Sequence, residues 1–221
     1  EVRLAFLEGK TTEALKRMQA LPAQLRDNEG LLYEKVKYHR KKDEVMPAVQ
    51  ILLKTSVTPA HASQWWKERN YFVRELIALQ DYQTAYKLLR NHHLEAGTED
   101  FSTAEWLMGW LSLRFLNHPN EAKQHFETML ANVKGAVSKA RGAYWMGRVY
   151  EVQNKKEQAA KWYSKAAKYK TTYYGQLAAA KIHDAPYPTL AKTPSATAEE
   201  KKRFEQKDIV QAAHILKGLG S

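Results

Sequence analysis

"AYWMGRVYEVQNKKEQAAKWYSKAA" (residues 143–167) contains the pattern that decides the fold. It joins two segments, 143–154 and 156–167, in which apolar residues recur at spacings of three and four. This spacing is typical of amphipathic helices. Glycine and proline are scarce, and the same spacing continues along almost the whole chain. The sequence therefore predicts an all-α protein built from helix hairpins.

The second helix of this hairpin has counterparts upstream. Each starts with a polar or acidic residue and places alanine four positions before a large apolar residue. The segments are "DEVMPAVQILLK" (43–54), "DYQTAYKLLRN" (81–91), "NEAKQHFETML" (120–130) and "KEQAAKWYSKAA" (156–167). Their alanines, at 48, 85, 122 and 159, are 85−48, 122−85 and 159−122 apart, which is 37 each time. "TTEALKRM" (11–18) lies three positions off this register, as terminal repeats often do.

The first helix of the hairpin also repeats. "EWLMGWLSLRFL" (105–116) aligns with "AYWMGRVYEVQN" (143–154) at a shift of 38, and both share a glycine, Gly109 and Gly147. Glycine costs about 1 kcal/mol relative to alanine inside a helix. We therefore interpret the shared glycine as the site of a close helix crossing.

A hairpin of about 37 residues lies between the ~34 residues of tetratricopeptide units and the ~40–47 of HEAT units. Such hairpins bury their apolar faces on their neighbours and stack into a curved array. The predicted fold is a right-handed superhelix, an α-solenoid of tetratricopeptide-like hairpins. Its six tryptophans are interpreted as core and inter-hairpin filler, with Trp65–Trp66 the pair least easily buried together.

The repeat pattern ends near residue 183. Residues 184–198 hold three of the seven prolines and few large apolar residues, which is typical of an extended connector. Two short helices, about 198–205 and 208–219, are expected after it. We predict a superhelical domain over 1–183, a proline-containing connector over 184–198, and the start of a linker-type helical region over 199–221.

Composition excludes several classes. Cysteine is absent, which excludes disulfides, thiolate metal sites and cysteine catalysis. No apolar run approaches the ~20 residues of a membrane span, so none is expected. Lys and Arg outnumber Asp and Glu by 35 to 24, which favours anionic partners. The densest basic cluster is interpreted as a solvated helix face and loop; it comprises Lys35, Lys37, Arg40, Lys41 and Lys42.

The histidines do not form a recognisable metal motif. His92 and His93 are adjacent and would point about 100° apart on a helix. His118 and His125 share a face, but no carboxylate is clearly placed with them. Neither a glycine-rich phosphate loop nor a Gly-x-Ser-x-Gly elbow is present. We therefore expect no metal, no cofactor and no catalytic residue in this chain.

Nucleic-acid binding is a further option that charge raises. "AAKWYSKAAKYKTTYY" (159–174) interleaves basic and aromatic residues, as single-strand binders do. Trp162 and Tyr163, however, fall in the repeat register as packing residues. We therefore expect no nucleic-acid partner.

The stretch 104–179 resembles the superhelical region of bacterial soluble lytic murein transglycosylases. The most specific parts are "EWLMGWLSLRFL" (105–116), "ARGAYWMGR" (140–148) and "TTYYGQLAA" (171–179). "WWKERNYFVRELIALQDYQTAYKLL" (65–89) fits ahead of them. The resemblance covers residues 60–220, and the first 60 residues match only as generic helical hairpins.

In that family a ring or horseshoe of helices carries a C-terminal lysozyme-like domain. That domain cleaves the bond between N-acetylmuramic acid and N-acetylglucosamine without water, and one glutamate serves as acid and then base. The product has a 1,6-anhydromuramoyl end. The resemblance implies a periplasmic protein whose partners are peptidoglycan glycan strands and its own C-terminal catalytic domain, and we expect a monomer.

The chain departs from the family at the catalytic motif. The family glutamate lies in a Glu-Ser pair followed by Gly-Leu-Met-Gln, and no Glu-Ser pair occurs here. "GLGS" (218–221) is not the second motif. We expect the catalytic domain to follow Ser221, so that this chain alone does not cleave glycan.

A few residues are candidates for direct glycan contact within a non-catalytic scaffold. They are Arg141, Arg148, Tyr173, Tyr174 and Gln176. Thr171 or Thr172 is predicted to cap the helix that follows. The alternative function is a tetratricopeptide-like protein–protein adaptor without a glycan role.

Overall fold

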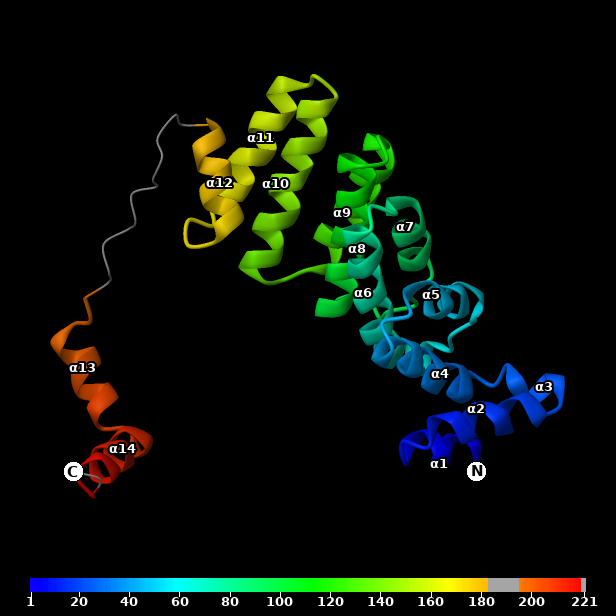
Figure 1. Ribbon diagram of the computed structural model, residues 1–221. Coiled ribbons are helices and arrows are strands. Elements are labelled where there is room, and N and C mark those ends of the chain that lie inside the picture. The colour runs from blue at the N-terminus through cyan, green and yellow to red at the C-terminus, as the bar shows by residue number, and fades with distance from the viewer. Residues whose placement is uncertain (183–194, 220–221) are drawn as a thin grey trace. The chain divides into compact units, whose positions relative to one another are not determined.

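The computed structural model describes residues 1–182 and 195–219, and every secondary-structure element in these ranges is a helix (Figure 1). The all-α prediction is therefore confirmed. Two compact units, Glu1–Pro188 and Thr189–Ser221, divide the chain. Most of the predicted connector over 184–198 lies outside the described residues. The helices are α1 Val2–Leu7, α2 Thr11–Ala20, α3 Ala23–Arg26, α4 Glu29–Lys41, α5 Val45–Lys54, η1 Pro59–His61, α6 Ala62–Ala78, α7 Tyr82–Arg90, α8 Glu99–Arg114, α9 Pro119–Asn132, α10 Ala136–Val152, α11 Lys156–Ala167, α12 Tyr173–Ile182, α13 Ala198–Glu205 and α14 Asp208–Leu219.

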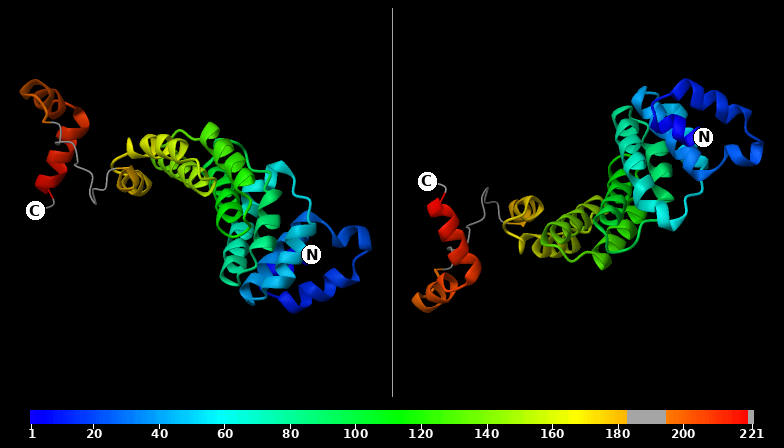
Figure 2. Two further views of the ribbon diagram at one scale, coloured as in Figure 1. Left: turned by 90° about the horizontal axis from the view of Figure 1, so that it is seen from above. Right: turned by 90° about the horizontal axis from the view of Figure 1, so that it is seen from below.

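The helices of the first unit pack as successive hairpins. α4 packs with α5, α6 with α7, α8 with α9, and α10 with α11. The second helix of a hairpin also packs on the first helix of the next one, as α5 does on α6, α7 on α8 and α9 on α10. α12 closes the row against α10 and α11. Figures 1 and 2 show the hairpins of this unit following one another in a curved row.

The turns inside four hairpins share an unusual backbone conformation. Each contains a non-glycine residue with a left-handed φ between 54° and 60°. Consecutive turns are 80−43, 117−80 and 154−117 residues apart, again 37. At the α6 end, for example, the Asp81 amide donates to the Leu76 carbonyl at 2.8 Å, which is the Schellman pattern. The residues in question are Asp43, Gln80, Asn117 and Asn154.

The predicted close crossings are confirmed. A Cβ added at Gly109 would lie 2.6 Å from Cε1 of Phe126, and one at Gly147 would lie 2.5 Å from Cε1 of Tyr163. Both rings belong to the alanine–apolar pairs of the repeat, and every member of those pairs is buried. Hence the glycine on the first helix and the large residue on the second fit each other within a hairpin.

The tryptophans only partly follow the prediction. Trp65 and Trp66, expected to be the least easily buried pair, are only 2% and 3% exposed. Adjacent helical residues point about 100° apart, and α6 is covered by α4, α5 and α7, so both rings find neighbours. Trp65 packs edge-on against Tyr33 and donates to Glu29 at 2.8 Å. By contrast, Trp106, Trp110 and Trp162 remain partly exposed.

A buried arginine ties two hairpins together. Arg69 on α6 is 2% exposed, and its guanidinium donates to the carbonyls of Leu88 at 2.9 Å and Leu52 at 3.1 Å. These carbonyls lie in the last turns of α7 and α5, where helices leave carbonyl groups without internal partners. Burial lowers the pKa of Arg69 to about 10. Its role in the core is therefore to cap two helix ends at once.

The second unit consists of α13 and α14, at the positions predicted from the sequence. Thr197 and Glu200 form a reciprocal capping box at the start of α13. Neither helix contains a buried residue. Among the described helices of both units, none is long and apolar enough to cross a membrane.

Candidate functional site

Aromatic rings form a chain of contacts across several helices of the first unit. We call this chain the aromatic track. It starts on α7, runs along α8 and continues over α10 to α12. Successive ring centres are 4.0 to 6.4 Å apart, within the range of favourable aromatic pairs. Its members are Tyr82, Phe115, Trp110, Trp106, Trp145, Tyr144, Tyr174 and Tyr173.

The track is accessible at two places and buried between them. Phe115 is 38% exposed and stacks on Tyr82, with Trp110 and Trp106 partly exposed beside it. At the other end Tyr173 is 69% exposed. Trp145 and Tyr144 lie below the surface and connect the two ends. A ligand with flat apolar faces therefore has two separated stacking places on the track.

Two arginines of α10 flank the track. The Arg141 guanidinium lies 4.9 Å from the centre of the Trp106 ring and donates to the Ser102 hydroxyl at 3.4 Å. Burial lowers its pKa. Arg148 lies 5.9 Å from the Trp145 ring and pairs with Glu151, with 2.9 Å between Nε and Oε2. Both arginines therefore hold positive charge against the rings, where cation–π attraction favours it.

A salt-bridged carboxylate completes this region. Glu151 receives Lys181 of α12 at 3.0 Å as well as Arg148. Burial acts to raise the pKa of Glu151, but the Lys181 and Tyr163 contacts outweigh it and lower the pKa. Burial and this carboxylate also raise the pKa of Tyr163 strongly. The Lys181–Glu151 pair thus joins α10 to α12, the two helices that the Tyr144–Tyr174 ring contact also joins.

The residues predicted from the sequence separate into two groups. Arg141, Arg148 and Tyr174 lie along the track, and Tyr173 ends it. Gln176 has no ring contact of this kind; its amide donates to the Lys170 carbonyl at 3.3 Å. Gln176 therefore belongs to the start of α12, on the exposed surface.

The cap of α12 is the predicted one. The Thr172 hydroxyl accepts from the Gly175 amide at 3.1 Å and donates to the Tyr169 carbonyl at 2.8 Å. A Cβ at Gly175 would lie only 2.1 Å from that carbonyl oxygen. Glycine is therefore required here by the preceding turn.

Sequence reasoning missed the track because it interpreted the large aromatics as filler. The signal that was available is the pair Trp106 and Trp110, which are four positions apart and therefore lie on one side of α8; Phe115 follows the helix and does not share this spacing. A stripe of this kind is equally typical of a buried helix face. Only the packing of α10 and α12 shows which rings remain accessible.

A second cluster of polar side chains joins α7, α8 and α9. Glu105 is 7% exposed and lies between two histidines: His125 Nδ1 is 2.8 Å from Oε2, and His92 Nε2 is 3.5 Å from Oε1. His125 Nε2 contacts the Tyr86 hydroxyl at 2.9 Å, and that hydroxyl donates to Glu121 at 3.3 Å. The expectation that His118 and His125 lack a carboxylate is therefore wrong, since Glu121 also lies 3.5 Å from His118.

This cluster has the connectivity of a nucleophile, base and orienting acid, but its chemistry differs. Burial and the Glu121 carboxylate raise the pKa of Tyr86, whereas an activated nucleophile needs a lowered pKa. His92 Nδ1 accepts the Leu94 amide at 2.9 Å, so this ring can donate to Glu105 only from Nε2. Burial acts to raise the pKa of Glu105, but the bonds from His125 and His92 outweigh it and lower the pKa. The cluster is thus a clamp between hairpins. Over the described ranges, no group of three or more potential ligand side chains is placed to hold a metal ion.

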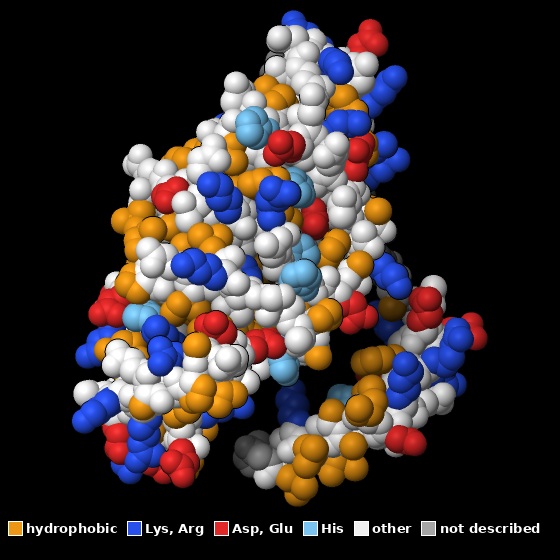
Figure 3. Space-filling model, turned by 90° about the vertical axis from the view of Figure 1, so that its right-hand side faces the viewer, with side chains coloured by type: hydrophobic (Ala, Val, Ile, Leu, Met, Phe, Trp, Pro, Cys, Tyr) orange, Lys and Arg blue, Asp and Glu red, His pale blue; other side chains and the backbone are white. Residues whose placement is uncertain are grey.

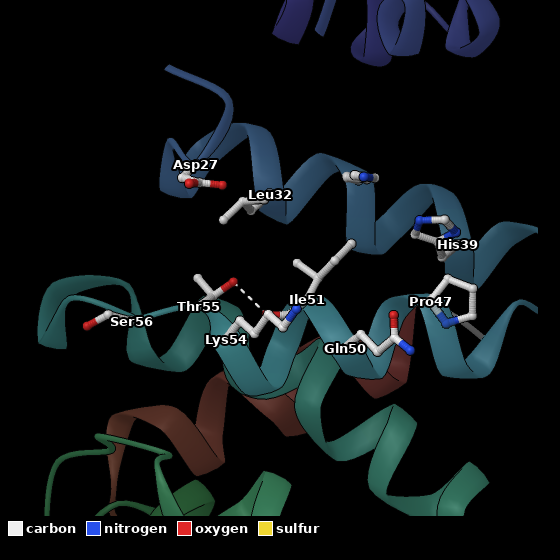
Figure 4. Close-up of a pocket in the computed structure, with 10 residues that line it drawn as sticks. Asp27, Leu32, His39, Pro47, Gln50, Ile51, Lys54, Thr55 and Ser56 are labelled. Atoms are coloured by element: carbon white, nitrogen blue, oxygen red, sulfur yellow. Dashed lines mark hydrogen bonds between the residues drawn. The ribbon is translucent and has the colours of Figure 1, made fainter. Parts of the chain in front are cut away.

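A groove of about 700 Å³ follows the α4–α5 hairpin. Leu32 and His39 project into it from α4, and Pro47, Ile51 and Lys54 face them from α5 (Figure 4). His39 is held by Glu44 at 2.7 Å. The groove mixes apolar and charged side chains without a convergent set of polar groups.

On the face shown in Figure 3, basic side chains lie interspersed with acidic ones and with histidines. The basic cluster singled out in the sequence is likewise partly neutralised, since Lys37 pairs with Glu34 at 3.0 Å and Arg40 with Glu68 at 3.4 Å. No family model, curated protein or solved structure matches this chain.

Proposed function

We propose that this chain is the non-catalytic superhelical scaffold of a periplasmic lytic transglycosylase. In this proposal it holds a catalytic domain that cleaves peptidoglycan, and it guides glycan strands over its own surface. Two observations support the proposal: the resemblance of residues 104–179 to that family, and the aromatic track. The track is the observation that carries the glycan-binding part.

The proposed architecture is a right-handed α-solenoid of tetratricopeptide-like hairpins. It is supported by the recurrence of left-handed turn residues every 37 positions. The same interval separates the buried alanines of the second helices. A shared turn conformation and a shared packing position at one period are what stacked repeats require.

The chemistry of a glycan strand fits the track. Pyranose rings present C–H groups that pack on the negative faces of aromatic rings. The partly exposed rings of Trp106 and Trp110 stack with 5.8 Å between centres, at one accessible end of the track. The peptide stems of murein also bear carboxylate groups, and the Arg148 guanidinium, 5.9 Å from the Trp145 ring, places positive charge along the track. A strand that contacts both ends would be held by stacking and by charge.

Binding to purified murein sacculi tests this proposal. We expect the chain to sediment with sacculi at low salt and to be released by a neutral N-acetylglucosamine hexamer, because stacking does not require charge. Replacing both Trp106 and Trp110 with leucine should weaken binding at least tenfold. Trp162→Leu is the matched control, since Trp162 is also partly exposed but lies outside the track.

Far-UV circular dichroism establishes that each variant keeps its helices. Retention of the wild-type chain in the supernatant at low salt would exclude the guiding role. Equal binding by the track variant and the Trp162 control would exclude stacking on the track. The scaffold role is tested separately by the parent sequence after Ser221, where a Glu-Ser pair and a downstream Gly-Leu-Met-Gln motif are expected.

The α4–α5 groove favours a second candidate, a tetratricopeptide-like adaptor for a partner protein. Helical-repeat proteins commonly bind peptides in such grooves. This candidate predicts that Ile51→Lys abolishes capture of a partner and leaves sacculus binding unchanged. Ile51 lies outside the aromatic track, so Ile51→Lys tests the adaptor function and the Trp106 and Trp110 variant tests glycan binding independently.

A further inference from the structure

The second helix of the last hairpin, α11, carries a concentration of lysine that the proposed glycan track does not use. Residues 155–170 contain six lysines and one carboxylate, Glu157, a local net charge of 6−1, or +5. All six lysines are exposed. Within the described part of the chain none of them forms an ion pair with a carboxylate. Some exposed cations on other helices are paired, as Lys123 is with Glu127 and Arg17 with Glu13.

Three of these lysines are aligned. Lys161, Lys165 and Lys168 occupy positions i, i+4 and i+7, so they project from one side of α11 and span about 10 Å. Like charges at such spacing destabilise a helix by a few tenths of a kcal/mol per pair. Glu157 lies four positions before Lys161 on the same side of the helix, but it forms no ion pair with these lysines in the described part of the chain. We call these three residues the lysine stripe.

A tryptophan lies within the stripe. Trp162 is partly exposed, although its neighbour Tyr163 is buried in the hairpin. The Lys165 ammonium lies 3.8 Å from the centre of the Trp162 ring. Trp162 and the lysines line a shallow hollow of about 520 Å³ together with Ala160 and Ser164. The amphipathic ring is thus less exposed than the lysines around it, and one ammonium group packs on it.

We propose that the lysine stripe and Trp162 form a docking surface for an anionic phospholipid bilayer. Groups of four to eight basic residues on an amphipathic helix are typical of anionic-lipid binding, and residues 155–170 supply six. Tryptophan is the residue that favours the headgroup level of a membrane. Association is peripheral, through headgroup charge and one shallowly inserted ring.

The ring geometry favours lipid over nucleic acid. Single-strand binders stack bases on free aromatic faces. Here the Lys165 ammonium lies 3.8 Å from the centre of the Trp162 ring and so occupies one of its faces. A membrane interface accepts a ring with a cation beside it at the headgroup level, whereas a base that stacks on this face would have to displace the ammonium.

Vesicle sedimentation tests the docking surface. The full chain should bind vesicles of 30% phosphatidylglycerol in phosphatidylcholine and should not bind pure phosphatidylcholine. Each lysine near an anionic surface strengthens binding by about fivefold, so the triple variant Lys161→Gln, Lys165→Gln, Lys168→Gln should bind about 100-fold more weakly. The control carries the same charge change at exposed sites elsewhere: Lys41→Gln, Lys42→Gln and Lys54→Gln.

A second measurement locates the ring. Brominated phosphatidylglycerol should quench part of the tryptophan fluorescence of the wild-type chain, and Trp162→Phe should remove that quenching. Equal loss of vesicle binding in both triple variants would overturn the proposal in favour of diffuse charge. Binding to a single-stranded oligonucleotide through the stripe, without vesicle binding, would overturn it as well. Sacculus binding should be unaffected by Trp162→Phe, which separates this proposal from the glycan track.

Discussion

Replacing Gly147 with alanine tests the packing rule that links the two helices of each hairpin. The new Cβ would lie 2.5, 2.7 and 2.8 Å from three atoms of the Tyr163 ring. Normal carbon–carbon contacts are about 3.5–4.0 Å, so the ring must move by about 1 Å. Tyr163 is 3% exposed and is enclosed by α10, α11 and Tyr144, so it has no free space to enter.

The magnitude follows from two opposing contributions. Overpacking a filled core costs about 1–3 kcal/mol. Alanine returns about 1 kcal/mol of helix propensity relative to glycine. Because Tyr163 has no free space to enter, we take the upper part of the overpacking range, about 2–3 kcal/mol, and expect Gly147→Ala to lower the free energy of unfolding by about 1–2 kcal/mol. For a chain of this size each kcal/mol lowers Tm by about 2–4 °C.

Urea denaturation followed by circular dichroism at 222 nm measures the effect. Gly135→Ala is the control, because nothing lies within 4 Å of its added Cβ. Tyr163→Leu should remove the clash, so the double variant should be more stable than the sum of the two single changes, with a coupling of about 1 kcal/mol. If Gly147→Ala is as stable as the wild type, the close crossing is not what fixes glycine at this position.

Three further substitutions probe other features. Glu105→Gln should lower the free energy of unfolding at pH 7 by about 2 kcal/mol, because two charge-assisted bonds are lost. The folded pKa of Glu105 is lowered, so the stabilisation by its carboxylate is complete above about pH 4.5 and is lost as pH falls through the folded pKa. The unfolding midpoints of the wild type and the variant should therefore converge at that low pH. Arg69→Met should lower the free energy of unfolding, measured by denaturant titration, by about 2–4 kcal/mol, because it leaves two buried carbonyls without donors. Arg69→Lys should lower it less because one contact can be kept. An unchanged midpoint would contradict the capping role. Gln80→Gly should raise the free energy of unfolding by up to about 1 kcal/mol, because glycine adopts the left-handed turn without steric cost. The control is Gln83→Gly in the exposed part of α7, which should lower the free energy of unfolding by about as much.

Much of the fold could be predicted because the features that determine it are local in sequence. The alanine and the large residue of each second helix are four positions apart. The glycine of the first helix, which packs against that large residue, recurs in the first helix of the next hairpin. Gly109 and Phe126 are only 17 residues apart, since a hairpin brings them together directly. The cap at Thr172 was likewise visible, because a capping hydroxyl acts on an amide three residues ahead.

The candidate site was less predictable because it depends on contacts between hairpins. Tyr82 and Tyr174 belong to one track although 92 residues separate them. Helical periodicity says that Trp106 and Trp110 share a side of α8, but it does not say whether that side is covered. The clamp around Glu105 combines residues from α7, α8 and α9, and no spacing rule relates Tyr86 to His125.

The aromatic track and the polar contacts beside it both depend on how neighbouring hairpins pack against each other. The ring contacts cross from α7 to α8, from α8 to α10, and from α10 to α12. A polar contact accompanies each crossing: the Glu105 cluster joins α7, α8 and α9, Arg141 reaches Ser102 of α8, and Lys181 of α12 pairs with Glu151. Rings that rely on van der Waals contact lose much of their attraction when they separate by 0.5–1 Å. A change that loosens one clamp should therefore disturb the track at that crossing before it unfolds the chain. If glycan binding depends on a continuous track, Glu105→Gln should weaken sacculus binding under conditions where its circular dichroism is unchanged.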